Sequence, residues 1–430
     1  MKKSAILLLA AICSSAMAQP SPKNIIMVVG DGMGPEYTTA YRMFMDNKDT
    51  PEMELTIFDH LLVGMASTHP HISSGFVTDS AAGATALSAG VKTYNGAIGV
   101  DANKQAVQTV LEYAKLQGKR TGVAVTSQIN HATPAGFASH NVSRQNYNEI
   151  ADSYFDSKLN GQFRLDVMLG GGWKYFIRED RNLVEQFKGA GYQYIDNISQ
   201  LAQLQADKPV LGLFADEGLP WALDTQNQAR LPALVSTAVK QLSNDKGFFL
   251  LVEGSQIDWG GHSNDIAAAM MEMHDLAQTL EWLNTYVEQH PDTLFVVTAD
   301  HSTGGMTIGS RGQYAWQPEY LKGLQSAPAT IAKLLVTAKD PVALVNEQLG
   351  FALNESEQAS IKALKPGDEK AAYVAIKSLL DARSHTGWTT SGHTGIDVQI
   401  FAKGPGSELF SGHRDNTDIA KTVFTLLGKK

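Results

Sequence analysis

Acidic and histidine side chains follow several short apolar runs in this chain. The runs end at Asp31, at Glu253 and at the pair Asp300-His301. A single aspartate after such a run is usually a turn or capping residue. Two carboxylates and an imidazole that converge can instead hold a divalent metal ion, and zinc is the natural guest for nitrogen and oxygen ligands. If these run ends meet, they predict a metal site.

The segment from Glu253 to His262 is the most specific local pattern. Asp258 and His262 stand four residues apart, so a helical turn would place both on one face. Two glycines between them argue against a regular helix, and we expect a loop wrapped tightly around a ligand. A lone histidine is more often a surface or core residue, but this combination of aspartate, histidine and glutamate favours a metal site. His393, far along the chain, is the candidate third ligand.

Ser80 begins a run of small residues, 80–86, that predicts a tightly packed helix. Backbone N–H groups at a helix N-terminus attract an anion, and small side chains let it approach closely. An ordinary serine cap is the alternative for this motif taken alone. If Ser80 also completes the coordination of a metal ion, the ion would deprotonate its oxygen, and no histidine base would be required.

Three further polar residues lie between these motifs. His131 and Thr133 are two residues apart, so they can share a face of an extended segment. Arg144 follows shortly after them. An exposed arginine is usually a solvated charge, but near a pair of metal ions it can clamp phosphate oxygens with two hydrogen bonds.

Near-continuous apolar runs alternate with helical patterns along the chain. Such runs suit strands buried on both faces, as in a parallel sheet between helices, and in these sheets ligands bind outside the carboxyl ends of the strands. We therefore predict an α/β fold, a three-layer α/β/α sandwich with a large, mostly parallel central sheet. The expected strands lie at 25–30, 122–125, 248–252, 293–297 and 398–401, and two of the helices at 107–116 and 266–287.

Residues from about 305 to 390 break this alternation. The segment is mostly polar with a helical pattern, and glycine and proline are scattered through it. We expect an insertion or cap beside the site rather than a separate domain, so that residues 19–430 form one catalytic domain.

The N-terminus has the pattern of a secretory signal peptide at residues 1–18. Lys2 and Lys3 precede a short apolar stretch, which leads to small residues that end at Ala18. The stretch is too short to span a bilayer, and a buried N-terminal helix is the alternative. We expect cleavage after Ala18 and a periplasmic or secreted product without a membrane anchor.

Cleavage would change the composition of the mature chain. It removes Cys13, the only cysteine, so no internal disulfide can form. It also removes Lys2 and Lys3, which takes the formal net charge from −9 to −11. A net acidic chain argues against a nucleic-acid or anionic-membrane binder. An anionic substrate would then need a site with its own positive charge, which metal ions supply.

In their order and approximate spacing, these motifs together resemble the alkaline phosphatase family. The resemblance runs from about Lys23 to the C-terminus, although any one motif alone is weak. The matching positions are Asp31, Asp79-Ser80, 131–135, Arg144, 253–262, Asp300-His301 and 393–395.

The resemblance implies three metal ions, two Zn²⁺ and one Mg²⁺. The first zinc ion would be held by Asp258, His262 and His393. The second would be held by Asp31, Asp300 and His301, with Ser80 as its nucleophilic ligand. The third site, normally a magnesium site, would use Asp31, Thr133 and Glu253, whose hard oxygen ligands suit that ion.

The resemblance also implies the reaction. Phosphate monoesters would be hydrolysed through a covalent phosphoserine at Ser80, with inorganic phosphate as the product. Arg144 would hold the phosphoryl oxygens. The family further implies a homodimer.

Two positions depart from some bacterial relatives, which carry aspartate and lysine where this chain has His131 and Trp259. This pair resembles the variant of certain marine and cold-environment bacterial enzymes. We expect His131 beside the third metal site without binding the ion directly, and Trp259 near the phosphate pocket.

Three alternatives remain at this point. A phosphodiesterase or a cofactor-independent phosphoglycerate mutase would share the two-metal core, but Thr133, Glu253 and Arg144 favour the monoesterase. A sulfatase would need the sequence Cys/Ser-x-Pro-x-Arg at its nucleophile, whereas Ser80 is followed by Ala-Ala-Gly. A non-catalytic phosphate- or metal-binding protein would not need Ser80 at all.

Overall fold

The computed structural model describes residues 21–225 and 230–429. The signal peptide predicted at 1–18 lies outside the described residues. Within them, no helix has the length and apolar character that crossing a membrane requires.

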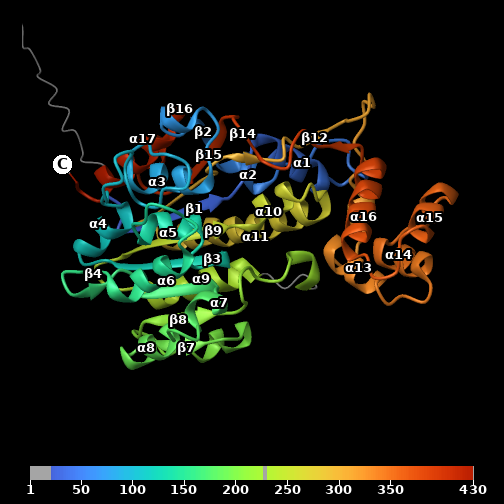
Figure 1. Cartoon of the computed structure of the whole chain (residues 1–430). Helices are drawn as coiled ribbons and strands as arrows, with labels where there is room; N and C mark the ends of the chain where they lie inside the picture. Colours follow the sequence, from blue (N-terminus) through green and yellow to red (C-terminus); the bar gives the residue numbers. More distant parts are fainter. Residues whose placement is uncertain (1–20, 226–229, 430) are drawn as a thin grey trace, which may run out of the picture.

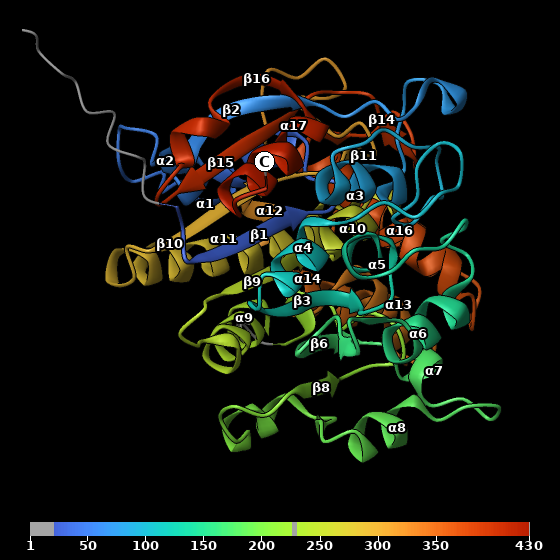
Figure 2. The same ribbon diagram turned by 90° about the vertical axis from the view of Figure 1, so that its left-hand side faces the viewer.

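A ten-stranded sheet forms the centre of the molecule, with the strand order β16-β2-β15-β10-β1-β9-β3-β6-β8-β7. Figure 2 shows most of these strands stacked in this order from top to bottom. All neighbours pair in parallel except β15, which is antiparallel to both β10 and β2. The strands are β1 (Asn24–Gly30), β2 (Leu62–Ser67), β3 (Arg120–Gln128), β6 (Val167–Gly171), β7 (Gln193–Ile195), β8 (Val210–Leu213), β9 (Phe248–Gly254), β10 (Thr293–Thr298), β15 (Val398–Lys403) and β16 (Gly412–Asp415). The mostly parallel sheet predicted from the apolar runs is confirmed.

Burial explains why the apolar runs became central strands. Every residue of β1, β9 and β10 is buried, because helices cover both faces of the sheet. One group of helices packs together around α3 and a second around α11. The first group is α3 (Ser80–Ala89), α4 (Val110–Leu116), α5 (Ala132–Ala138) and α17 (Asn416–Leu426). The second is α1 (Pro35–Met45), α2 (Ile57–Leu61), α9 (Arg230–Leu242), α10 (Gln256–His262) and α11 (Ile266–Gln289).

The lower end of the sheet in Figure 1 carries three further helices beside β6, β7 and β8. They are α6 (Tyr147–Asp156), α7 (Trp173–Phe176) and α8 (Leu183–Gly189). Phe155, Phe163, Phe187 and Tyr192 form a cluster of aromatic rings there, with ring centroids 4.9 to 5.6 Å apart in each contact. This end of the sandwich is therefore closed by aromatic packing.

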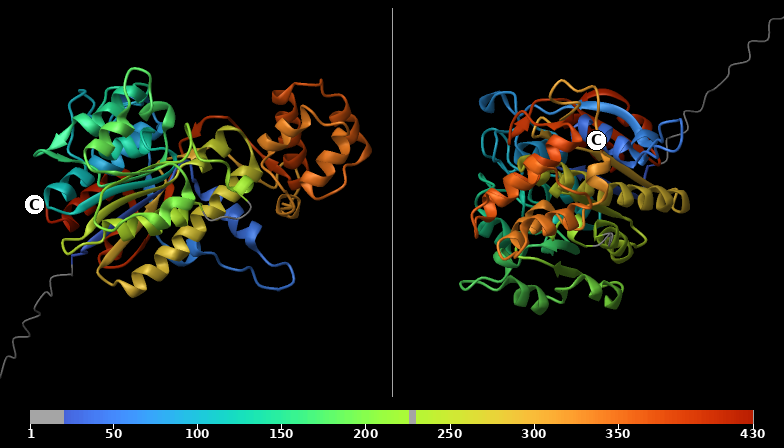
Figure 3. Two further views of the ribbon diagram at one scale, coloured as in Figure 1. Left: turned by 90° about the horizontal axis from the view of Figure 1, so that it is seen from below. Right: turned by 90° about the vertical axis from the view of Figure 1, so that its right-hand side faces the viewer.

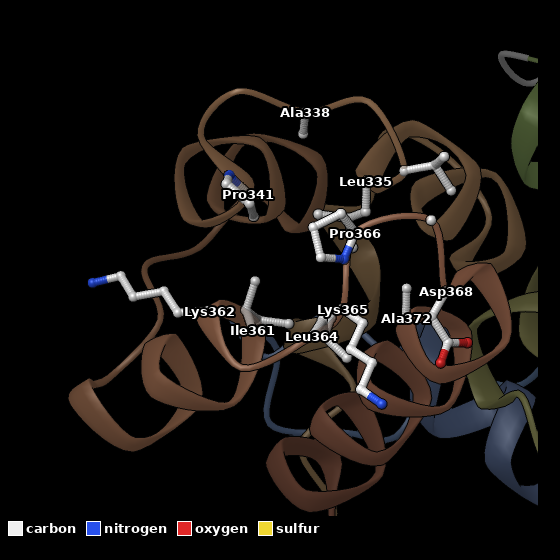
Figure 4. A pocket seen from close by; sticks show the side chains of 12 residues that line it. Leu335, Ala338, Pro341, Ile361, Lys362, Leu364, Lys365, Pro366, Asp368 and Ala372 are labelled. Carbon is white, nitrogen blue, oxygen red and sulfur yellow. The ribbon is translucent and has the colours of Figure 1, made fainter.

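The segment 305–390 is helical and stands to one side of the sandwich (Figure 1, Figure 3). Its helices are α12 (Glu319–Lys322), α13 (Pro328–Leu335), α14 (Pro341–Leu349), α15 (Glu355–Lys362) and α16 (Glu369–Ser384). A short antiparallel pair, β12 (Thr307–Ile308) and β13 (Thr386–Gly387), joins its two ends. We call this segment the side helices. A hollow of about 260 Å³ between Leu335, Pro341 and Ile361 lies among them (Figure 4).

Candidate metal centre

The predicted run ends meet at one edge of the sheet. The strands β10, β1, β9 and β3 are adjacent and parallel, so Asp31, Glu253 and the pair Asp300-His301 all leave the sheet at its carboxyl edge. Because β15 is antiparallel to β10, the residues that precede it arrive at the same edge. His393, on the short strand β14 (His393–Thr394), pairs with Thr303 of β11 (Ser302–Thr303).

The first group of side chains is Asp258, His262 and His393. One ligand atom of each lies within 4.8 Å of the others, and the Nε2 atoms of the two histidines are 3.1 Å apart. The Nδ1 atom of His262 lies 2.6 Å from the carbonyl oxygen of Ser391, and that of His393 lies 2.9 Å from the carbonyl oxygen of Thr78. Each Nδ1 atom thus lies within hydrogen-bond distance of a backbone carbonyl, the contact that orients metal-ligating histidines, and the two Nε2 atoms face each other.

The loop predicted between Asp258 and His262 is wrong, because these residues form the helix α10. The two glycines of α10, Gly260 and Gly261, allow neighbouring residues to pack closely against this helix. A Cβ atom at Gly260 would lie 3.0 Å from the Cα atom of Ala269 on α11, and one at Gly261 would lie 2.5 Å from the hydroxyl of Tyr37. The glycines therefore let α10 sit tightly against its neighbours, and the helical turn places both ligand candidates on one face.

The second group is fully buried and surrounds the Nε2 atom of His301. This atom lies 3.1 Å from the Ser80 hydroxyl, 3.4 Å from a carboxylate oxygen of Asp31 and 3.3 Å from one of Asp300. In a serine–histidine–aspartate triad the carboxylate would instead bind Nδ1, but here Nδ1 lies 3.3 Å from the Thr303 hydroxyl. Three oxygens thus surround one imidazole nitrogen, and this set of oxygen and nitrogen atoms suits a divalent cation.

Asp258 stands between the two groups. Its carboxylate, Asp31 and His301 also offer ligand atoms within 4.8 Å of one another. The Thr303 hydroxyl donates a hydrogen bond to the Oδ1 atom of Asp258 and so fixes its carboxylate. The two metal-binding groups are therefore neighbours, as a pair of ions acting on one substrate requires.

The third group combines Asp31, Glu253 and Thr133, as predicted from the resemblance, with His131. Ligand atoms of Asp31, His131 and Glu253 lie within 4.8 Å of one another, and the Oγ1 atom of Thr133 is buried without a partner. The extended segment predicted for His131 and Thr133 is wrong, because His131 caps α5 and Thr133 lies in its first turn. The helix nevertheless brings His131 to the group.

Unpartnered buried atoms show that these groups fit cations. Both carboxylate oxygens of Asp31, one each of Asp300 and Glu253, and Nδ1 of His131 have no hydrogen-bond partner among the described residues. Burial raises the pKa of Asp300 to about 8 and that of Glu253 to about 7, and raises the pKa of Asp31 well above its usual value. Clustered carboxyls of this kind are costly to ionise alone, and bound cations reverse that cost.

The histidines are in the protonation state that binds metals. Burial lowers the pKa of His301 far below its usual value, lowers that of His131 to about 3, and also lowers that of His393. All three imidazoles are therefore neutral at neutral pH, which is the ligand form.

Ser80 is the first residue of α3, and the cap is Asp79, whose carboxylate accepts a hydrogen bond from Ala82 N. The small residues of this helix fit a narrow space. A Cβ atom at Gly83 would lie 2.9 Å from the Cβ atom of Asp300, and one at Gly136 of α5 would lie 2.9 Å from that of Ala84. Glycine and alanine therefore bring Ser80 and the N–H groups at the N-terminus of α3 against the second group.

Arg144 and Trp259 border the site. The Arg144 guanidinium pairs with Asp79 at 3.0 Å, and its other terminal nitrogen lies 3.4 Å from Nε2 of His131. The ring of Trp259 meets His131 edge to face, with centroids 6.0 Å apart. Both residues thus touch His131, which links the third group to the arginine.

The roles of two supporting residues were not predicted from the sequence. Asp79 orients Arg144 while it caps α3, and its place before the serine was the only available signal. Thr303 contacts Asp258 and His301, and no pattern in the sequence marks it.

Comparisons with known proteins identify the family. A sequence profile of the family described as alkaline phosphatase matches residues 22–429. Alkaline phosphatase 3 of Bacillus subtilis is 49% identical over 95% of this chain and 90% of its own length.

Two solved structures are also similar. The cold-active alkaline phosphatase of a psychrophilic Shewanella species has a TM-score of 0.88 and 52% identity, over 94% of this chain and 99% of that one. A histidine-to-glutamate variant of the TAB5 alkaline phosphatase, with Mg bound in its M3 site, has a TM-score of 0.71 and 28% identity, over 96% and 99%. On the sequence profile and these relatives, the chain belongs to the alkaline phosphatase family.

Proposed function

We propose that this phosphomonoesterase hydrolyses its substrates through a covalent phosphoserine at Ser80, with two zinc ions and one magnesium ion. The observation that carries the proposal is the position of the Ser80 hydroxyl. It is buried, begins a helix, and lies 3.1 Å from the Nε2 atom of His301, which itself lies beside the carboxylates of Asp31 and Asp300. Because Asp79 caps α3, the Ser80 hydroxyl is not used as a helix cap, and its side-chain contact is with His301.

Each group of residues has a separate role in the proposed reaction. Ser80 attacks the phosphorus atom in line and the alcohol leaves from the opposite side, toward Asp258, His262 and His393. Arg144, held by Asp79, donates two hydrogen bonds to the phosphoryl oxygens, and the N-terminus of α3 adds backbone N–H groups. Zinc ions, when bound, would supply the positive charge that ionises Ser80 and stabilises the departing oxygen. Water then releases inorganic phosphate from the serine.

The proposed ligand sets follow the three groups of side chains. One zinc ion takes Asp258, His262 and His393, and the second takes Asp31, Asp300, His301 and Ser80. The magnesium ion takes Asp31, Thr133 and Glu253. The magnesium reported in the M3 site of the TAB5 variant supports a third ion, and the position of His131 beside Asp31 and Glu253 supports a role for this histidine in the choice of ion.

Hydrolysis of p-nitrophenyl phosphate at alkaline pH by the purified mature protein tests the reaction class. We expect turnover with zinc and magnesium, and loss of turnover after EDTA treatment that both ions together restore. Inactivity on this ester combined with cleavage of bis-p-nitrophenyl phosphate would replace the monoesterase by a phosphodiesterase. Phosphate binding without any turnover would favour the non-catalytic alternative.

Export to the periplasm or beyond the cell is proposed from the pattern at residues 1–18. N-terminal sequencing of protein recovered outside the cytoplasm should begin at Gln19. A mature protein that begins at Met1 would contradict the proposed cleavage.

A further inference from the structure

One face of α16, in the side helices, points toward the metal centre. Tyr373, Lys377 and Asp381 follow one another at intervals of four residues, so they form a single stripe along this helix. The Lys377 ammonium lies 4.3 Å from the centre of the Tyr373 ring. All three make polar contacts outside the side helices or with the segment that leads back to the sheet.

Tyr373 and Lys377, the first two residues of this stripe, form hydrogen bonds with the turn that follows His262. Lys377 donates a hydrogen bond to the carbonyl oxygen of Ser263, and the Tyr373 hydroxyl donates to the carboxylate of Asp265 at 2.9 Å. Ser263 directly follows His262 and caps the C-terminus of α10, where a cation is favourable. Asp265 is buried and caps the N-terminus of α11. The turn that carries His262 is thus fixed from the side helices.

The second half of the stripe holds the segment before His393. The indole N–H of Trp388 donates to the carboxylate of Asp381 at 3.1 Å. The Trp388 ring lies against Gly304, since a Cβ atom there would be 2.6 Å from the ring. Gly304 N donates to the carbonyl oxygen of Gly392 at 2.8 Å. A chain of contacts therefore leads from α16 to the residue next to His393.

The first metal group needs such support more than the second group does. Asp31, Asp300 and His301 are 0% exposed and follow central strands of the sheet. The His262 side chain is 41% exposed and that of His393 is 12% exposed. Neither histidine belongs to the ten-stranded sheet, so the orientation of both depends on the contacts behind them.

We propose that α16 is a positioning element for the first metal group. Tyr373 and Lys377 hold His262, and Asp381 with Trp388 holds His393, so that the side helices set how tightly the ion at this group is bound. The inference rests on the proposed metal centre. None of the four residues belongs to the three groups of proposed ligands, and each acts through the segment that carries a ligand.

Metal binding measured apart from activity tests this inference. The metal-free protein is titrated with Zn²⁺ in competition with a chromophoric chelator, and the release of each ion to EDTA is followed in time. The variants are Tyr373→Phe, which removes a single oxygen, and Lys377→Met. The control is Arg383→Met on the same helix, because Arg383 forms its two 2.7 Å bonds with Glu357 of α15 and so stays within the side helices.

We expect both test variants to bind one ion about tenfold more weakly and to release it correspondingly faster, while the other zinc ion is unaffected. Arg383→Met should keep all ions at wild-type affinity, and the thermal midpoints of the metal-free test variants should fall no further than that of this control. Unchanged ion binding in Tyr373→Phe and Lys377→Met would overturn the inference, as would equal weakening in the control. A wild-type protein that takes up no zinc would instead overturn the proposed metal centre, and this inference with it.

Discussion

We propose that His131 influences which ion the third group prefers. It places a ring nitrogen beside the carboxylates of Asp31 and Glu253, whereas magnesium prefers a shell of hard oxygen ligands. Its Nδ1 atom has no partner among the described residues, and Arg144 lies on its other side. A change at this one position should therefore alter both the third group and the surroundings of Arg144, the proposed phosphate-binding residue.

Replacement of His131 by aspartate should raise the affinity for Mg²⁺ at least about tenfold, because it adds a carboxylate oxygen to the third group. Isothermal titration of the zinc-loaded protein with Mg²⁺ measures this. His131→Gln is the control, since it adds no charge and should not raise the affinity. An aspartate variant whose magnesium dependence and turnover match the wild type would show that His131 does not govern this site.

The buried carboxyls also predict a dependence of stability on pH in the metal-free protein. Burial raises the pKa of Asp300 to about 8 and that of Glu253 to about 7, so the folded state binds protons more tightly than the unfolded state does. The contribution of these two carboxyls to stability is therefore fully present below about pH 4 and is lost as pH rises to about 8.

Thermal unfolding followed by calorimetry after EDTA treatment should show the midpoint falling across this pH range. The metal-loaded protein should not show the fall, because bound cations stabilise the ionised carboxylates. Asp300→Asn, which cannot ionise, should flatten the profile of the metal-free protein. Parallel profiles with and without metal would refute this account of the carboxyls.

At the scale of single elements, α3 positions Ser80 by close packing. Its fourth residue, Gly83, faces Asp300, where an added Cβ atom would lie 2.9 Å from the Asp300 Cβ and 3.2 Å from its carbonyl oxygen. Gly83→Ala should push the helix away from the second metal group. A displacement of about 1 Å can cost roughly 100-fold in rate, so we expect kcat/KM to fall by about that factor while the protein still folds.

Steady-state kinetics on p-nitrophenyl phosphate measure this effect. Gly189→Ala is the matched control, because Gly189 ends the helix α8 and an added Cβ atom there meets no other atom within 4 Å. Its kcat/KM should equal that of the wild type. Full activity in Gly83→Ala would mean that the contact between α3 and Asp300 does not set the position of the nucleophile.

Apolar runs could predict only part of the sheet. The central strands β1, β9 and β10 are buried on both faces and therefore read as continuous apolar sequence. The strand β2 was missed because its residues are mostly half-exposed, and β16 because it contains no apolar residue. The short strand β6 ends in two glycines, which weakened its signal.

The candidate site, like the sheet, could be predicted only in part from the sequence. Residues at strand ends were found because sheet topology alone brings them together. The glycines of α10 led to the wrong prediction of a loop, because they are required by the close approach of Ala269 and Tyr37, which local sequence does not reveal. The position of His131 against Asp31 and Glu253 likewise depends on where α5 begins, which spacing alone does not reveal.

At the scale of the whole molecule, an exposed apolar surface lies next to the metal centre. Phe76 is 77% exposed and Ile72 is 70% exposed, and both precede Ser80 closely in the chain. Val77 is also exposed, and so is Ile396, which follows Gly395, where an added Cβ atom would lie 3.5 Å from the Val77 side chain. Clustered exposed apolar side chains mark interaction sites, and we propose that a second copy of the chain covers this surface in a homodimer.

Phe76→Asp should therefore convert the dimer into monomers, because the interface would have to bury an unpaired charge. Sedimentation velocity measures the change. Leu116→Asp is the control, since Leu116 is exposed at the end of α4, near the start of β3 and so at the opposite edge of the sheet. A wild-type monomer, or a Phe76→Asp protein that remains dimeric, would contradict this assignment of the surface.

The most direct test of the whole account is the search for phosphate bound covalently to Ser80. The zinc- and magnesium-loaded protein is incubated with a monoester labelled in its phosphate group, quenched with acid, digested, and examined by mass spectrometry and for retained label. We predict phosphate on the peptide that contains Ser80, with none in Ser80→Ala, where turnover also collapses. A wild-type enzyme that turns over without ever carrying phosphate on Ser80, or a Ser80→Ala variant that retains full activity, would contradict the proposed role of this serine.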